Sequence, residues 1–508
     1  MKKLLSVLMI LSLLLSLASC GAAKDETMAP GINYAPNNGN QEKAEEEGGM
    51  APDASPDEED VDQPTFIENP FIATMEQPVS TFSADVDTAS YTYFRKLVNN
   101  RYSLDYLKQT GASFRTEEFI NYFKYEANAP VNGELFGVKA QIVETPWNAN
   151  TVLMQLTLQA EEYTPEGGNN LVFLIDVSGS MSSSDKLPLL KKTFSYLTSQ
   201  LTDKDRVSIV TYSGKEEVIL QGCPGNQGER ILSAINNLKA SGSTNGQAGL
   251  QKAYQIAADY FIEKGNNRII MASDGDLNVG ISSPSELKDF VETKRDQGIY
   301  LSVLGFGTGN YRDPNMEALA DNGNGVYYYI DGESEAERIF GTDLLSTLYT
   351  VARDTKLQIT FDPAAVSSYR LIGYENRLLN EEDFNDDTKD AGEVGAGHQV
   401  TVCYELTLTA KTAETQDWMK LAVRYKRTGE NESTLNEYAI GAAHRTETPS
   451  ADLRFIAAVI ETAMVLHNST YLDRDFTLEL ILGELNAMDF TSAPDRAEFR
   501  DLIGKIVG

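Results

Sequence analysis

The chain has 508 residues, enough for about three domains of roughly 150 residues each. It carries 43 Lys and Arg against 75 Asp and Glu, a formal net charge of −32. A field of that sign repels phosphate backbones and anionic lipid headgroups, which excludes general nucleic-acid binding. Three cysteines cannot build a disulfide scaffold, and three histidines leave little for a histidine-rich metal centre. The composition therefore indicates a large, acidic, globular protein.

The N-terminus has the pattern of an export signal. Lys2 and Lys3 precede an apolar run, Leu4–Leu17, that is too short to span a ~30 Å hydrocarbon core comfortably. The run leads into Ser19-Cys20, which resembles the end of the bacterial lipobox, where cleavage precedes a cysteine that carries a diacylglycerol. We expect Cys20 to anchor the exported protein to the outer face of the cytoplasmic membrane, or to the outer membrane of a cell that has two. The alternative is an ordinary secretory signal.

The segment after Cys20 is predicted to be an unfolded tether. Residues 21–64 contain acidic runs at 45–47 and 57–60 among Gly, Pro, Ala and Asn, with few apolar side chains to offset the entropy of ordering. Calcium binding by these runs is a less favoured alternative, because the carboxylates lack the spacing of a calcium loop.

If Cys20 is acylated, the remaining thiols belong to Cys223 and Cys403. An exported protein meets conditions in which disulfides form. Neither the spacing nor the number of these cysteines requires a bond between them, so the pairing stays open.

Between residues 166 and 353, short apolar runs alternate with amphipathic helical patterns, which predicts a doubly wound α/β sheet. Residues 171–175 form a continuous apolar run, typical of a parallel strand covered on both faces. Its expected sister strands are 207–210, 269–272, 299–304 and 326–330. The run 218–220 follows a Ser-Gly turn so closely that we expect an antiparallel hairpin at the sheet edge. Helices are expected over 187–201 and 250–261.

Polar side chains follow the predicted strands, at the edge where ligands bind in such sheets. Asp176, Ser178 and Ser180 follow the first strand, Thr244 precedes the helix at 250, and Asp274 follows the strand at 269. Each alone is a common cap or turn residue. Together they offer only oxygen, which suits Mg²⁺, with Mn²⁺ and Ca²⁺ as alternatives. Two carboxylates merely neutralise a divalent cation, so a bound ion would still attract a carboxylate from a partner protein.

The pattern Asp176-x-Ser178-x-Ser180, followed by Thr244 and Asp274, resembles the von Willebrand factor type A (VWA) domain with its metal-ion-dependent adhesion site. The resemblance implies metal ligation, direct or through water, at these five positions, and a partner that supplies an acidic side chain. The lead-in residues 241–243 depart from the paired glycines that are more usual in the family.

The flanks also resemble those of bacterial VWA lipoproteins, a family for which the resemblance supplies no established activity. The residues that carry this likeness are Asn69-Pro70-Phe71, Ser80–Tyr91, Glu117-Glu118, Asn121–Phe123 and Asp390–His398. Independently of the resemblance, residues 91–125 have the pattern of short helices. Alternating residues predict antiparallel strands with one solvent-facing side at 136–160, 357–361, 400–406 and 421–425.

We therefore predict an α/β domain inserted in an antiparallel β-sandwich, with helical segments at both ends. The predicted ranges are 1–19, a signal peptide; 20–64, the lipidated cysteine and tether; 65–135, helical; 136–165, the first sandwich strands; 166–353, the VWA domain; 354–430, the rest of the sandwich; and 431–508, helical. The expected function is non-enzymatic recognition of an unknown protein with an exposed Asp or Glu.

Two other classes of function remain as alternatives. In a purely structural envelope protein, the metal would only tighten the loops. An enzyme is the less favoured class: Asp85 and Asp87 lie close to the Asp-x-Asp-x-Thr pattern of haloacid-dehalogenase-type phosphatases, but Thr88 is one place early and residues 79–83 read as a poor buried strand. Capping of the following helix, with a salt bridge, is the ordinary role for these aspartates. A serine hydrolase is disfavoured because Ser178 lacks the glycines of a nucleophile elbow.

Overall fold

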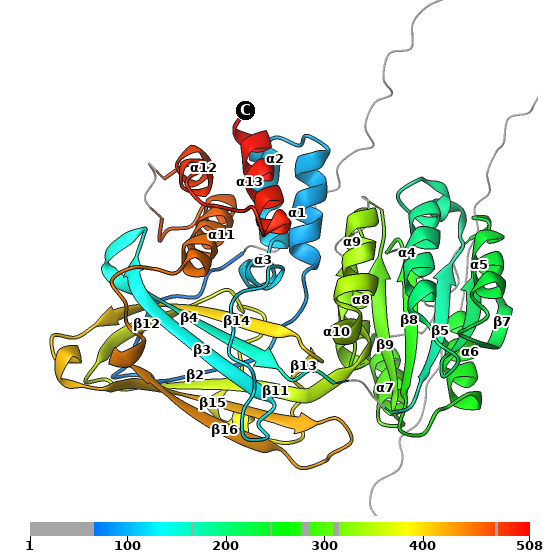
Figure 1. Ribbon diagram of the computed structural model, residues 1–508, viewed down its shortest axis with the longest axis horizontal. Coiled ribbons are helices and arrows are strands. Elements are labelled where there is room, and N and C mark those ends of the chain that lie inside the picture. The colour runs from blue at the N-terminus through cyan, green and yellow to red at the C-terminus, as the bar shows by residue number, and fades with distance from the viewer. Residues whose placement is uncertain (1–65, 164–165, 244–245, 276–283, 308–313, 473–475) are drawn as a thin grey trace, which may run out of the picture. The chain divides into compact units, whose positions relative to one another are not determined.

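The structure, a computed structural model, describes residues 66–163, 166–243, 246–275, 284–307, 314–472 and 476–508 (Figure 1). These ranges belong to one unit, Asp62–Gly508. The predicted signal peptide, Cys20 and the tether lie outside the described residues, as does Thr244. None of the helices in these ranges is both long enough and apolar enough to cross a membrane.

A mostly parallel sheet forms the central domain. Its strands are β5 (Asn169–Asp176), β6 (Arg206–Tyr212), β7 (Glu216–Pro224), β8 (Asn266–Ser273), β9 (Ile299–Gly305) and β10 (Tyr327–Tyr329). Among the described residues they have the order β10-β9-β8-β5-β6-β7, and β7 is the antiparallel member, paired with β6 at the edge. The predicted hairpin is therefore confirmed.

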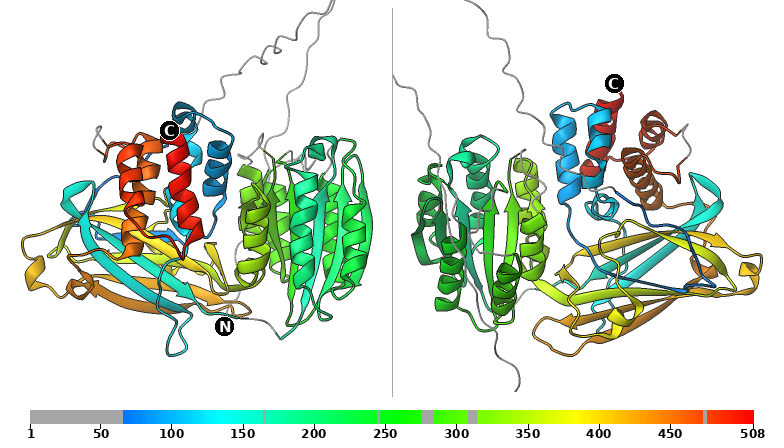
Figure 2. Two further views of the ribbon diagram at one scale, coloured as in Figure 1. Left: turned by 45° about the horizontal axis from the view of Figure 1, so that its top comes forward. Right: turned by 180° about the vertical axis from the view of Figure 1, so that it is seen from behind.

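Helices cover both faces of this sheet (Figure 2). They are α4 (Leu187–Gln200), α5 (Gly228–Asn236), α6 (Gly246–Asp259), α7 (Pro284–Arg295), α8 (Pro314–Asn322), α9 (Glu333–Glu337) and α10 (Leu344–Leu348). Phe173 of β5 stacks on Phe194 of α4 at 4.2 Å between ring centroids, while its neighbour Leu174 packs on the opposite face with Leu250 of α6. Because neighbouring side chains of a strand point to opposite faces, a strand buried on both sides needs an unbroken apolar run.

The chain on either side of this domain forms two antiparallel sheets. The first contains β1 (Ile72–Ala73), β12 (Val366–Ile372), β14 (Gln399–Leu408), β4 (Asn148–Ala160) and β3 (Phe136–Thr145), in that order. The second contains β13 (Gly392–Gly395), β11 (Thr350–Phe361), β15 (Asp417–Arg427) and β16 (Thr434–Gly441), with β2 (Val79–Ser83) also paired to β11. The α/β domain lies in the chain between β4 and β11, so the predicted insertion in a β-sandwich is confirmed.

Helices from both ends of the chain form a separate layer. They are α1 (Ala89–Asn99), α2 (Leu104–Gln109), α3 (Thr116–Asn121), α11 (Ala451–His467), α12 (Leu478–Asn486) and α13 (Pro494–Val507). Phe123 contacts Phe455 of α11 and Phe499 of α13, with ring centroids 4.8 and 5.8 Å away. Residues more than 300 positions apart thus share one aromatic core.

Two expectations about the sandwich need correction. Strands β1, β2 and β16 lie in the ranges 65–135 and 431–508, which were predicted to be helical. The outer face of the first sheet is also not solvent-facing, because Leu153 of β4 and Cys403 of β14 are buried in the same core as α3 and α11 (Figure 1). A local alternation of residues cannot reveal that distant helices will cover the polar-looking side.

The structure also answers the question of the two thiols. Cys223 lies on β7 of the central domain and Cys403 on β14 of the sandwich. Both are buried and free, so they form no disulfide with each other.

Arg95 of α1 joins the helical layer to the central domain. Its guanidinium donates to both carboxylate oxygens of Asp331, at 2.7 and 2.6 Å, and to Glu335 of α9 at 2.8 Å. All three side chains are nearly inaccessible to solvent. A fork of this kind holds two segments in a fixed register and leaves buried carboxylates behind when it is removed.

We expect Arg95→Met to lower the free energy of unfolding by about 3–5 kcal/mol, because Asp331 loses its counter-charge inside the protein and Glu335 retains only Arg338. Chemical denaturation measures the change. The matched control is Lys192→Met, which removes an exposed ion pair with Glu333 on the same helix, α9, and should cost less than about 1 kcal/mol. Equal effects of the two substitutions would contradict the role of Arg95.

Glu461 is an unpaired acid in the middle of α11. Its side chain is fully buried, and neither carboxylate oxygen has a hydrogen-bond partner among the described residues. Burial, with a smaller contribution from Glu484, raises the pKa of Glu461 to about 9. The unfolded chain has an ordinary carboxyl pKa of about 4.3, so folding retains a proton that the unfolded chain loses above that pH. The stability contributed by the protonated carboxyl is therefore lost as the pH rises from about 4.3 towards 9.

Glu461→Gln should consequently stabilise the protein at pH 8 by at least about 1 kcal/mol, and the difference from wild type should shrink towards pH 5. Denaturation at the two pH values tests this. The exposed Glu447→Gln serves as control and should show a difference that does not change with pH. An effect of Glu461→Gln that is the same at both values would contradict a raised pKa.

Candidate metal site at the strand ends

The carboxyl ends of β5 and β8 place two aspartates at one edge of the sheet. Ile175 of β5 pairs with Ala272 of β8 in parallel register, so Asp176 and Asp274 both follow at this edge. They are 0% and 3% exposed, respectively. The two carboxylates also affect each other electrostatically.

Two hydrogen bonds hold the Asp176 carboxylate in place. Its Oδ1 accepts from the Ser178 backbone N–H at 2.8 Å, and its Oδ2 accepts from the Ser273 hydroxyl at 3.3 Å. Burial and the charge of Asp274 raise the pKa of Asp176 to about 6, although these bonds oppose the rise. Ser273 is not among the predicted ligands, although its position at the end of β8 is a signal that the sequence contains.

The two serine hydroxyls that were predicted as ligands lie together. Ser178 Oγ and Ser180 Oγ are 3.0 Å apart, with Ser178 buried and Ser180 exposed. The 241–243 segment packs against this loop, since the Gly179 N–H donates to the Gly242 carbonyl at 2.9 Å and the Ser241 N–H to the Val177 carbonyl at 2.7 Å. The structure therefore brings Asp176, Ser178, Ser180 and Asp274 to one edge. The fifth predicted ligand, Thr244, lies just beyond the last described residue of that segment.

Lys186 places a cation on the site. Its ammonium donates to Asp274 Oδ2 at 2.8 Å, and its side chain is 19% exposed. The ammonium competes with a metal ion for Asp274, whereas the two carboxylates and the serine hydroxyls are oxygen donors of the kind that a hard divalent cation accepts. The residues present therefore fit a hard metal ion. No sequence motif pointed to Lys186, since it precedes the apolar stripe of α4.

A neighbouring ion pair ties this loop to the helical layer. Lys96 of α1 donates to Asp185 Oδ2 at 2.9 Å, and Asp185 in turn accepts from the Ser183 hydroxyl at 2.6 Å. The segment between Ser180 and α4 is thus connected to a helix outside the central domain.

The residues of the rival phosphatase hypothesis have a structural role. Asp85 and Asp87 are each 4% exposed and form ion pairs with Arg377 at 3.3 Å. Asp87 also accepts from the Tyr327 N–H at 3.2 Å, which links it to β10. The expected salt bridge is present, whereas the expected capping is wrong: α1 begins after Thr88 and has no side-chain cap. Residues 79–83, read as a poor buried strand, form β2 with four buried residues.

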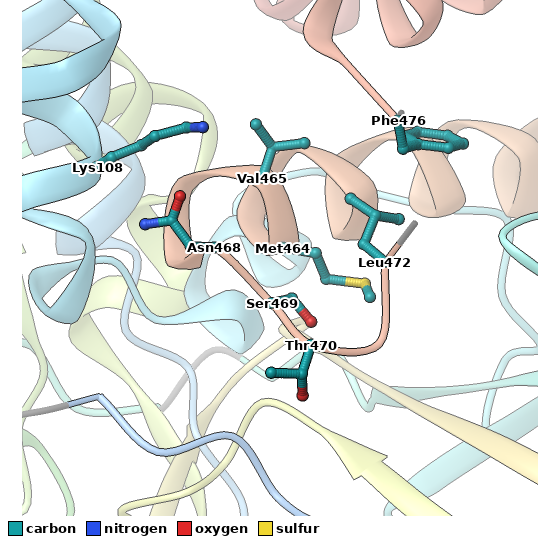
Figure 3. Close-up of a pocket in the computed structure, with 8 residues that line it drawn as sticks. All are labelled: Lys108, Met464, Val465, Asn468, Ser469, Thr470, Leu472 and Phe476. Atoms are coloured by element: carbon teal, nitrogen blue, oxygen red, sulfur yellow. The ribbon is translucent and has the colours of Figure 1, made fainter. Parts of the chain in front are cut away.

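A hollow of about 660 Å³ lies away from this edge, at the end of α11 (Figure 3). Its lining residues are Lys108, Met464, Val465, Asn468, Ser469, Thr470, Leu472 and Phe476. Among the described residues of this lining, Lys108 is the charged one.

Family profiles match three consecutive parts of the chain. The profile of the von Willebrand factor type A domain matches residues 170–342. A profile described as von Willebrand factor matches residues 58–155, and one described as the C-terminal part of uncharacterized protein YfbK matches residues 346–507.

Individual proteins give the same picture. Uncharacterized protein YfbK of Escherichia coli strain K12 is 38% identical over 464 residues, which covers 86% of this chain and 80% of YfbK. Human inter-alpha-trypsin inhibitor heavy chain H3 is 27% identical over 189 residues, covering 34% of this chain and 21% of its own length.

Two solved structures are also similar. The von Willebrand factor type A protein from Catenulispora acidiphila is 17% identical, with a TM-score of 0.40, and the match covers 76% of this chain and 89% of that one. Proximal thread matrix protein 1 from the mussel byssus, solved with a zinc-occupied MIDAS motif, is 20% identical, with a TM-score of 0.29 and coverage of 35% and 44%.

We expect Lys186→Met to bind magnesium about tenfold more tightly than the wild type, because the ammonium no longer competes for Asp274 and a hydrogen bond to a charged group contributes about 1.5–3 kcal/mol. Isothermal titration calorimetry with magnesium chloride measures the affinity. Lys192→Met, which changes an exposed lysine of the helix that follows Lys186, is the control and should leave the affinity unchanged. Weaker binding by Lys186→Met would show that the lysine supports the site instead of competing for it.

Proposed function

Because this chain belongs to the family of VWA-domain proteins that includes Escherichia coli YfbK, we propose that it is a protein-binding module whose interaction depends on a divalent metal. Domains of the VWA family are in general non-enzymatic interaction modules that commonly bind a divalent metal at an adhesion site. The proposed ligands in this chain are Asp176, Ser178, Ser180, Thr244 and Asp274. The proposed metal is Mg²⁺, with Mn²⁺ and Ca²⁺ as alternatives.

One observation carries this proposal: two buried carboxylates and a pair of serine hydroxyls converge at the sheet edge, and the outermost hydroxyl, that of Ser180, is exposed. Two aspartates would neutralise a divalent ion without giving it an excess of negative charge. A bound ion would supply electrostatic attraction for an acidic side chain. Within this chain, the Ser178 N–H and the Ser273 hydroxyl hold the proposed ligand Asp176 in place.

The proposed partner is a protein with an exposed Asp or Glu. The proposed location is the outer face of the cytoplasmic membrane, or the outer membrane of a cell that has two, with the lipid on Cys20 and residues 21–64 as the tether. A lipid anchor with two acyl chains gives stable attachment, and a long acidic tether would let the domain search for partners away from the surface.

A second candidate, a structural envelope protein whose metal only tightens the loops, is favoured by the Lys96–Asp185 contact, which connects the site loop to a helix outside the domain. Thermal melting with and without magnesium, run beside a magnesium-dependent pull-down, separates the two. Stabilisation without any metal-dependent partner supports the structural role.

We expect chelation, or Asp176→Ala in the presence of magnesium, to weaken partner binding by at least tenfold, since either change removes the charge that attracts the acidic side chain. The measurement is a pull-down from envelope extract followed by affinity determination with the purified partner. Asp259→Ala changes an exposed acid of the same domain and should bind like the wild type. Undiminished affinity after both chelation and Asp176→Ala would refute metal-dependent recognition.

A further inference from the structure

Three acidic side chains converge where the sandwich meets the central domain. They are Asp354 of β11, Asp390 just before β13, and Glu393 of β13. One carboxylate oxygen from each lies within 4.8 Å of the other two. None of these residues belongs to the site at the end of β5.

An irregularity in the β11–β13 ladder produces this convergence. The pairing jumps from Ala352↔Val394 to Thr355↔Gly392, so two residues of β11 oppose Glu393. One of them, Asp354, has a φ of +52°, a left-handed conformation that is uncommon outside glycine. The bulge turns the Asp354 side chain out of the normal alternation and towards the acids of the neighbouring strand.

Glu393 is the unusual member of the set. Its side chain is 8% exposed, and its Oε2 is buried without a hydrogen-bond partner among the described residues. Burial, followed by the charges of Asp354 and Asp390, raises the pKa of Glu393 well above its ordinary value, against the opposing charges of Arg353 and Arg295. A buried oxygen without a partner calls for an explanation, such as a bound water or ion.

The two aspartates are only partly engaged by cations. Lys426 contacts Oδ2 of Asp354 at 2.7 Å, and Arg295 of α7 contacts Oδ2 of Asp390 at 2.9 Å. A side-chain hydrogen bond also joins Asp390 to Asp354. Two direct ion pairs thus face three acidic side chains at the point of convergence.

A cavity of about 240 Å³ lies beside the cluster. Asp390 and Glu393 line it, together with Asp321 of α8 and Arg377. The lining therefore comes from both the central domain and the sandwich. A space of this size holds several water molecules, which could complete the coordination shell of an ion.

We propose that Asp354, Asp390 and Glu393 form a second divalent-cation site, selective for calcium, at the junction of the two domains. Calcium accepts six to eight oxygens in flexible geometry and favours several carboxylates, whereas magnesium requires a near-octahedral shell and keeps more of its water. Three acids from a bulged strand and its neighbour, with water from the cavity, match the calcium preference. Glu393 Oε2 then gains the partner that it lacks.

Calcium at this position strengthens the junction between domains. Asp390 is already held by Arg295 of α7, and Asp321 of α8 borders the same cavity. The ion relieves the mutual repulsion of the three carboxylates, so its effect is a rise in stability that depends on calcium concentration.

The test uses the chain carrying Asp176→Ala, so that the site at the end of β5 does not contribute. Calcium chloride at 1 mM is expected to raise the thermal midpoint by about 2 °C or more, and magnesium chloride by less. Adding Glu393→Gln is expected to abolish the calcium shift without lowering the midpoint in calcium-free buffer, because glutamine has nearly the same shape as the buried acid. Glu382→Gln, an exposed acid of the same segment, should keep the shift.

Equilibrium dialysis against calcium gives a second readout that does not depend on unfolding. The Asp176→Ala chain is expected to bind one calcium ion, and the chain that also carries Asp390→Asn is expected to bind at least tenfold more weakly. Absence of a calcium shift in the Asp176→Ala chain overturns the proposal. An equal rise of the thermal midpoint with magnesium also overturns it. So does a variant with Glu393→Gln that keeps both the calcium-dependent rise and the bound calcium ion. None of these outcomes bears on the metal site proposed at the end of β5.

Discussion

The burial of β5 on both faces is the constraint on which the proposed function depends. This strand lies between β6 and β8, and helices cover it on either side. Its last residue, Asp176, therefore reaches the sheet edge with no exposed surface of its own. A carboxylate in that position needs compensation, which the Ser178 N–H and the Ser273 hydroxyl supply in part. The remaining negative charge, shared with Asp274, is what makes this edge suitable for a cation.

Buried arginines neutralise acidic side chains between segments of the chain. The chain has a large excess of acids, and several of them are buried between segments. Arg95 pairs with acids near α9, and Arg377 pairs with Asp85, Asp87 and Asp321. Each arginine thus holds together segments that are distant in sequence. At Glu393, where a buried oxygen lacks a partner among the described residues, we propose a metal ion in place of a direct ion pair.

Much of the central domain could be predicted from local patterns. An unbroken apolar run such as 171–175 is compatible with few environments other than a parallel strand covered on both sides, and the leucine spacing in α4 has the period of a helix. The flanks were harder. Strand β16 alternates exposed and half-buried residues and lies next to helical sequence, so its pairing with β15 was missed. The outer face of the first sheet was expected to contact water, because the helices that cover it come from both ends of the chain.

The order of Asp176, Ser178, Ser180, Thr244 and Asp274 after apolar runs was sufficient by itself to indicate the α/β fold and its oxygen-rich edge, since strand direction alone determines where those residues emerge. Only the tertiary structure determined which basic side chains lie against these residues. Lys186 reaches Asp274 from the start of a different element, and Asp354 meets Asp390 and Glu393 only because a bulge reverses the direction of one side chain. Contacts of this kind depend on packing between segments with no shared periodicity, and a linear pattern does not record them.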